Sequence, residues 1–140
     1  MFNVLTSINW LSVLVAFAAY FMLGALWYMV LFPKPYQASL GKEHEPAASQ
    51  SPGLLYVVGP AVCVLLITIT CAVLLYALHI DTYGAALRFA LLVGVGYLVS
   101  NTVNIAINPN MPRPFFYGLI TGSYHLAGMM FVNLILVAMK

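Results

Sequence analysis

The chain has 140 residues, of which 64% are hydrophobic and only 6% are charged, and its formal net charge is +2. Soluble domains carry about 25% charged residues, so this chain has too few charges to cover a surface that faces water. Its five basic residues are also too few for a nucleic-acid-binding surface. The composition therefore predicts an integral protein of the lipid bilayer, folded as a single transmembrane domain over residues 1–140.

Four apolar segments are long enough to cross a bilayer as helices, because a helical span needs about 20 residues. They cover about residues 10–32, 54–78, 85–108 and 115–139, with a polar loop over residues 33–53. Trp10 and the Trp27–Tyr28 pair lie at the two ends of the first segment, as is typical of interfacial anchors. Asn9 is placed to cap its start. The predicted fold is an all-α, four-helix membrane bundle.

The sequence shows no arrangement typical of catalysis. No pair of carboxylates lies in the apolar segments, and there is no H-E-x-x-H motif or glycine-rich phosphate loop. Ser123 and His125 are two residues apart and therefore point to different faces of a helix. Glu43, His44 and Glu45 could in principle bind a metal, but neighbours in a loop do not converge on one point. We predict a solvated connector there, and no enzyme activity, metal site or cofactor.

The third and fourth segments are joined by a proline-rich corner around Met111, which predicts a tight antiparallel hairpin. Residues equally distant from Met111 should then lie at similar depths, because both helices rise about 1.5 Å per residue. The resulting pairs are Asn104 with Gly118, Asn101 with Thr121, Tyr97 with His125 and Gly94 with Gly128. Steps of three and four residues place the members of each set on one helix face.

We call the side chains expected to meet along this hairpin, with two from the end of the first segment, the seam. The seam consists of Tyr97, Asn101, Asn104, Thr121, Tyr124, His125, Trp27 and Tyr28. Pro60 in the second segment frees the carbonyl of Tyr56, which is expected in the same half of the membrane. The opposite half holds almost nothing polar. The sequence therefore predicts a polar, aromatic-walled pocket that opens toward the corner.

Two functions remain open for the seam. An ionisable group at the depth of His125 often marks a proton or ligand site, which indicates a small oligomeric carrier or channel, or a small-molecule-binding membrane protein. Alternatively, Asn, Thr, Tyr and His hydrogen-bond between membrane helices, and Gly118-x-x-x-Gly122 is typical of close packing. The protein would then be a structural or accessory subunit of a larger membrane complex. Because one small bundle offers little room for a pathway, we expect a homo-oligomer or a larger complex.

Three stretches carry a resemblance to a known family. Asn9-Trp10-Leu11 opens the first segment, Gly24-Ala25-Leu26-Trp27-Tyr28 lies near its end, and the last segment reads Leu119-Ile120-Thr121-Gly122-Ser123-Tyr124-His125-Leu126. Together they resemble the small bacterial membrane proteins of domain-of-unknown-function family 1761, over essentially the whole chain. The resemblance implies a four-span, multi-pass protein of the bacterial inner (cytoplasmic) membrane. It implies no particular activity.

Overall fold

The structure is a computed structural model that describes residues 2–44 and 53–140. Every regular element in these residues is helical, and they include no strand. Four helices are long and apolar enough to cross a membrane: Trp10–Leu31, Leu55–Ala77, Tyr83–Ala106 and Pro114–Ala138. The all-α class with four membrane-spanning helices, predicted from the sequence, is confirmed.

Two of the four spans change helix type along their length. The first consists of α1 (Trp10–Leu26) and a π-helical turn, η2 (Trp27–Leu31). The third consists of α4 (Tyr83–Val93), a π-helical segment, η3 (Gly94–Val99), and α5 (Ser100–Ala106). The second and fourth spans are α3 (Leu55–Ala77) and α6 (Pro114–Ala138). Two short helices lie outside the spans, namely η1 (Phe2–Thr6) and α2 (Pro33–Ser39).

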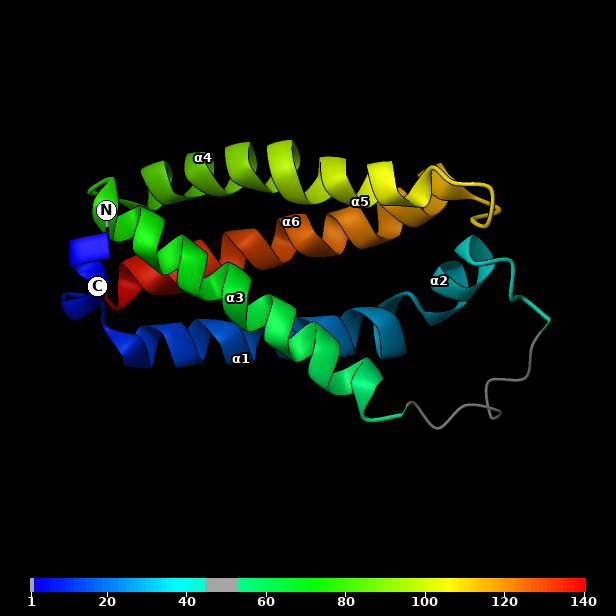
Figure 1. The fold of residues 1–140 in the computed structure, drawn as a ribbon, viewed down its shortest axis with the longest axis horizontal. Helices are drawn as coiled ribbons and strands as arrows, with labels where there is room; N and C mark the ends of the chain where they lie inside the picture. The colour runs from blue at the N-terminus through cyan, green and yellow to red at the C-terminus, as the bar shows by residue number, and fades with distance from the viewer. Residues whose placement is uncertain (1, 45–52) are drawn as a thin grey trace.

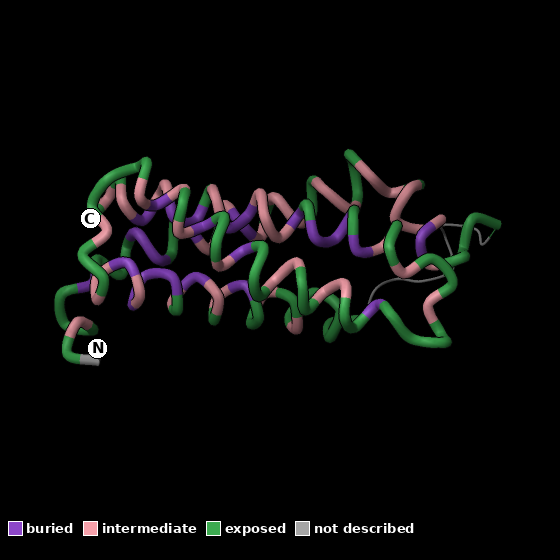
Figure 2. Tube along the Cα trace, turned by 90° about the horizontal axis from the view of Figure 1, so that it is seen from above, coloured by how far each residue is buried: buried purple, intermediate pink, exposed green. Residues whose placement is uncertain are grey.

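Helix α6 lies in the middle of the bundle, with α1 along one side and the α4–η3–α5 span along the other (Figure 1). Helix α3 crosses them obliquely, and both termini lie at the same end. Figure 2 shows that buried positions gather toward this end of the bundle. The core there includes Tyr20, Leu75, Met129, Val132 and Leu136.

Hydrogen bonds fasten the end of the bundle where the termini lie. Asn9 caps α1 as predicted, because its side-chain oxygen accepts hydrogen bonds from the amides of Leu11 and Ser12. Its Nδ2 also donates to the carbonyl of Met139 at 2.7 Å. Lys140 pairs with Asp81 in the turn between α3 and α4. The first span, the last residues and this turn are thereby held together.

The opposite end contains more structure than the sequence analysis expected. We predicted a solvated connector over residues 33–53, but α2 begins at Pro33, since proline is well suited to the first position of a helix. Arg113 from the corner donates to the carbonyl of Ala38 at 2.9 Å and pairs with Glu43. The guanidinium holds the pKa of Glu43 below its ordinary value. Glu45 lies outside the described residues, and the described ones contain no metal-binding group of three or more His, Cys, Asp or Glu.

The first turns of α3 diverge from α6 at this end (Figure 1). Tyr56 is 74% exposed, and a Cβ added at Gly59 would meet nothing within 4 Å. This part of α3 therefore does not contribute to the pocket expected at the corner end. Pro60 lies inside α3. It is tolerated there because the residues of α3 that precede it form only the first turn of the helix.

Candidate functional site

Glycines of α6 set its distance from the third span. A Cβ added at Gly118 would lie 2.7 Å from Cγ2 of Val103, and one added at Gly122 would lie 3.1 Å from Cγ1 of Val99. The two contacts lie at nearly the depths that reflection about Met111 predicts, because Gly118 was expected opposite Asn104 and meets its neighbour Val103. The Gly118-x-x-x-Gly122 motif therefore packs within the chain, against two valines.

The seam is not assembled as the sequence analysis expected. Tyr97, Asn101 and Asn104 lie on an exposed face of the third span, and Tyr97 is 74% exposed. Each helical residue turns by about 100°, so a contact made by Val103 directs the next residue, Asn104, away from α6. Valine fills the space above a glycine with apolar contacts, whereas a buried carboxamide needs hydrogen-bond partners. The expected contact between Asn104 and Gly118 is thus replaced by the contact with Val103.

The other five predicted residues do come together, against α1 and η2 rather than against the third span. The ring of Tyr124 lies 5.3 Å from that of Tyr28 and 6.4 Å from that of Trp27, centroid to centroid. Trp27 also donates its indole N–H to the carbonyl of Ile120 at 3.1 Å. The aromatic pair at the end of the first span therefore packs on α6.

Tyr20 completes this group and was missed by the sequence analysis. Its hydroxyl shares a 2.7 Å hydrogen bond with Nδ1 of His125, and its side chain is 0% exposed. A Cβ added at Gly128 would overlap the Tyr20 ring, so only glycine allows this approach. The sequence spacing places Tyr20 on the same helix face as Gly24 and Trp27, because the three residues recur at steps of four and three. We call Tyr20, Trp27, Tyr28, Thr121, Tyr124 and His125 the tyrosine–histidine cluster.

The available hydrogen-bond partners indicate which group is the donor in the bond between Tyr20 and His125. If Nδ1 were the donor, the hydroxyl proton of Tyr20 would have no acceptor in residues 2–44 and 53–140. A hydroxyl that donates to Nδ1 satisfies both groups and places the imidazole proton on Nε2. Within the same residues Nε2 has no partner, and His125 is only partly buried. The cluster therefore contains one N–H donor without a partner in the described residues, on a partly buried side chain.

Thr121 adds a second unused polar group. Its hydroxyl is buried and has no hydrogen bond of good geometry in the described residues, although it lies near the Tyr28 hydroxyl. A buried polar group without a partner is unfavourable by about 1–3 kcal/mol. The cluster thus holds unsatisfied polar groups within a membrane-spanning region, those of His125 and Thr121 among them.

A family model described as a protein of unknown function, DUF1761, matches residues 11–137 of the chain. The chain belongs to domain-of-unknown-function family 1761. The resemblance drawn from the sequence is confirmed, and it covers both helices that form the tyrosine–histidine cluster. Neither a curated protein nor a solved structure matches the chain.

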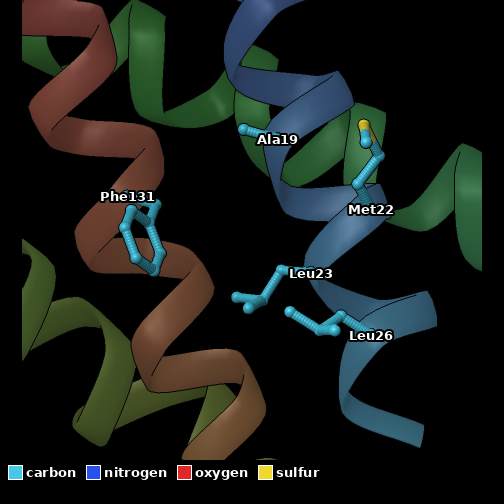
Figure 3. Close-up of a pocket in the computed structure, with 5 residues that line it drawn as sticks. All are labelled: Ala19, Met22, Leu23, Leu26 and Phe131. Carbon is cyan, nitrogen blue, oxygen red and sulfur yellow. The ribbon is translucent and has the colours of Figure 1, made fainter. Parts of the chain in front are cut away.

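This member of family 1761 also has an apolar groove of about 370 Å³ between α1 and α6 (Figure 3). Its lining consists of Ala19, Met22, Leu23, Leu26 and Phe131. No member of the tyrosine–histidine cluster lines it, and none of its side chains is polar. Such a surface suits the acyl chains of the surrounding lipid and offers nothing that would orient a polar ligand.

Proposed function

We propose that the protein is a small-molecule-binding membrane protein of the carrier class, and that the tyrosine–histidine cluster is its binding site. The observation that carries the proposal is the hydrogen bond between Tyr20 and Nδ1 of His125, which orients the ring and leaves Nε2 without a partner in the described residues. Ionisable side chains within spans are unfavourable and often mark pathways for ligands or protons. A purely structural histidine would be expected to use both ring nitrogens.

The chemistry of the cluster indicates the class of ligand. An N–H donor binds a carbonyl, carboxylate or ether oxygen, and the hydroxyl of Thr121 can either donate or accept. The rings of Tyr28 and Tyr124 supply flat apolar walls beside these groups. We therefore infer an uncharged or weakly acidic molecule with a polar head that accepts a hydrogen bond and a flat or apolar body.

The proposal is tested by native mass spectrometry of the protein released from nanodiscs, with the wild type beside two variants. His125→Asn keeps a polar atom near Nδ1 for Tyr20 but removes the Nε2 group. Tyr20→Phe removes the partner of Nδ1 and keeps Nε2. We expect the wild type to carry a bound small molecule that His125→Asn loses, whereas Tyr20→Phe retains part of it.

The control is Leu119→Ala, an exposed position on α6 outside the cluster, which should bind as the wild type does. Equal retention of the bound molecule by His125→Asn and by the control would contradict the proposed site. A wild type that carries nothing, with all variants assembled alike, would favour the role of an accessory subunit in a larger membrane complex.

A further inference from the structure

The third span has an outward face on which two carboxamides make no hydrogen bond to any described residue. We call Gly96, Tyr97, Ser100, Asn101 and Asn104 the amide face; all five are exposed. The hydroxyl of Ser100 donates to the carbonyl of Val95 at 2.8 Å and is therefore satisfied. The carboxamides of Asn101 and Asn104 have no hydrogen bond to any described residue. The amide face is separate from the tyrosine–histidine cluster, which lies between α1 and α6.

An exposed side chain on a membrane-spanning helix faces lipid, whereas an exposed side chain on a soluble protein faces water. Asn101 lies five residues before Ala106, the last residue of its span, which places it about 8 Å from the end of the helix. Lipid chains offer neither donors nor acceptors, so a carboxamide at that depth gains by meeting another polar group. Asn104 is nearer the end and can also reach the headgroups. The amide face is thus unfavourable as a lipid contact and suited to contact with protein.

The shape of this face allows another helix to come close. A Cβ added at Gly96 would meet nothing within 4 Å, so the backbone itself is uncovered there. Gly96, Ser100 and Asn104 follow at steps of four residues and form one strip of small and medium side chains. Strips of this kind let two membrane helices approach, and polar side chains beside them then hydrogen-bond across the contact.

We propose that the amide face is the contact between two copies of this chain. Copies inserted in the same orientation are related by a two-fold axis along the membrane normal, which brings residues close to that axis near the same residue of the other copy. A carboxamide carries both donors and an acceptor, so Asn101 can bond reciprocally to Asn101 of the second copy. A single Asn is thereby satisfied without a complementary partner of a different sequence. Because the amide is self-complementary, a second copy supplies the matching donor and acceptor at the same depth.

The contact is tested by disulfide cross-linking in native membranes. Cys63 is exposed and is replaced by Ala, whereas Cys71 is buried and stays. Ser100→Cys then reports on the amide face, with Leu119→Cys as a control of similar depth, since its neighbour Gly118 contacts Val103. We expect Ser100→Cys to give a dimer of the chain, and Leu119→Cys to give little. Equal cross-linking at the two positions, or a product that contains a different protein, would overturn the proposal.

The role of the amides is tested with Asn101→Leu and Asn104→Leu together in the Cys63→Ala chain, in which Ser100 is kept so that the dimer stays non-covalent. Leucine preserves bulk and suits lipid, so the fold should survive. We expect dimerisation to weaken about tenfold, measured as the dimer fraction against protein density in liposomes by single-molecule photobleaching. Asn101→Gln, which keeps the carboxamide, should retain most of the dimer. A leucine variant that dimerises as well as the parent would show that the carboxamides do not hold the contact.

Discussion

Two sets of polar side chains within the spans of this protein differ in their surroundings. Thr121 and Tyr124 on α6 are buried, His125 is partly buried, and all three lie near aromatic rings of α1 and η2. Asn101 and Asn104 on α5 are exposed and bond to nothing in the described part of the chain. Both sets follow the same helical spacing and lie at comparable depths. Polarity and spacing alone therefore do not decide which helix face turns inward.

The residues at the contact positions explain the difference. Helix α6 has glycines on two faces, so that Gly118 and Gly122 receive valines of the third span while Gly128 receives the ring of Tyr20. Close approach on the Tyr20 side brings polar groups of α6 to within hydrogen-bond distance of α1. On the other side the valines fill the contact, and the asparagines beside them turn outward. Packing at glycines is thus what orients both polar sets.

The largest expected effect comes from closing the space at Gly128. Gly128→Ala would place a Cβ inside the ring of Tyr20, which forces α1 and α6 apart and disturbs the bond to His125. Overpacking of this kind destabilises by about 3 kcal/mol. The free energy of unfolding in mixed micelles, followed by circular dichroism, measures the loss.

The control for this substitution is Gly84→Ala in α4. The added Cβ meets nothing within 4 Å there, and Ala is the better helix former, so stability should be unchanged or slightly higher. Equal effects at the two glycines would mean that helix propensity rather than contact with Tyr20 determines the result. Packing at glycines would then not explain why one polar set turns inward and the other outward.

Much of the fold could be predicted from the sequence, because spans are recognised as uninterrupted runs of about 20 apolar residues. The depth at which the third and fourth spans meet also follows from the position of the corner. The face that meets could not be predicted, since it depends on whether Val103 or Asn104 fills the space at Gly118. The spacing places Tyr20 on one helix face with Gly24 and Trp27, but it does not show which helix that face meets. The role of Tyr20 depends on a contact with His125, which lies far from it in the sequence.

A smaller effect is expected where α6 meets the third span. Gly118→Ala places a Cβ 2.7 Å from Val103, and should destabilise by about 1.5 kcal/mol because the valine must move. Val103→Ala in the same chain removes the obstructing methyl groups, so the two substitutions together should cost less than the sum of their separate effects. A double-mutant cycle on the free energy of unfolding measures this coupling. Coupling of the same size between Gly118→Ala and Asn104→Ala would instead place the asparagine at the contact, as the sequence analysis had expected.

The smallest expected effect separates the two tryptophans, which the sequence presents as equivalent interfacial anchors. Trp27 donates to the carbonyl of Ile120 across the contact between the first span and α6, whereas Trp10 is 47% exposed and its indole N–H bonds to no described residue. Phenylalanine preserves an aromatic ring and removes the donor. Hydrogen bonds between membrane helices contribute about 0.6 kcal/mol on average, so Trp27→Phe should lower the free energy of unfolding by about that amount more than Trp10→Phe does. Equal losses for the two substitutions would mean that Trp27 acts only as an anchor, because a ring without a donor would then serve equally well at both positions.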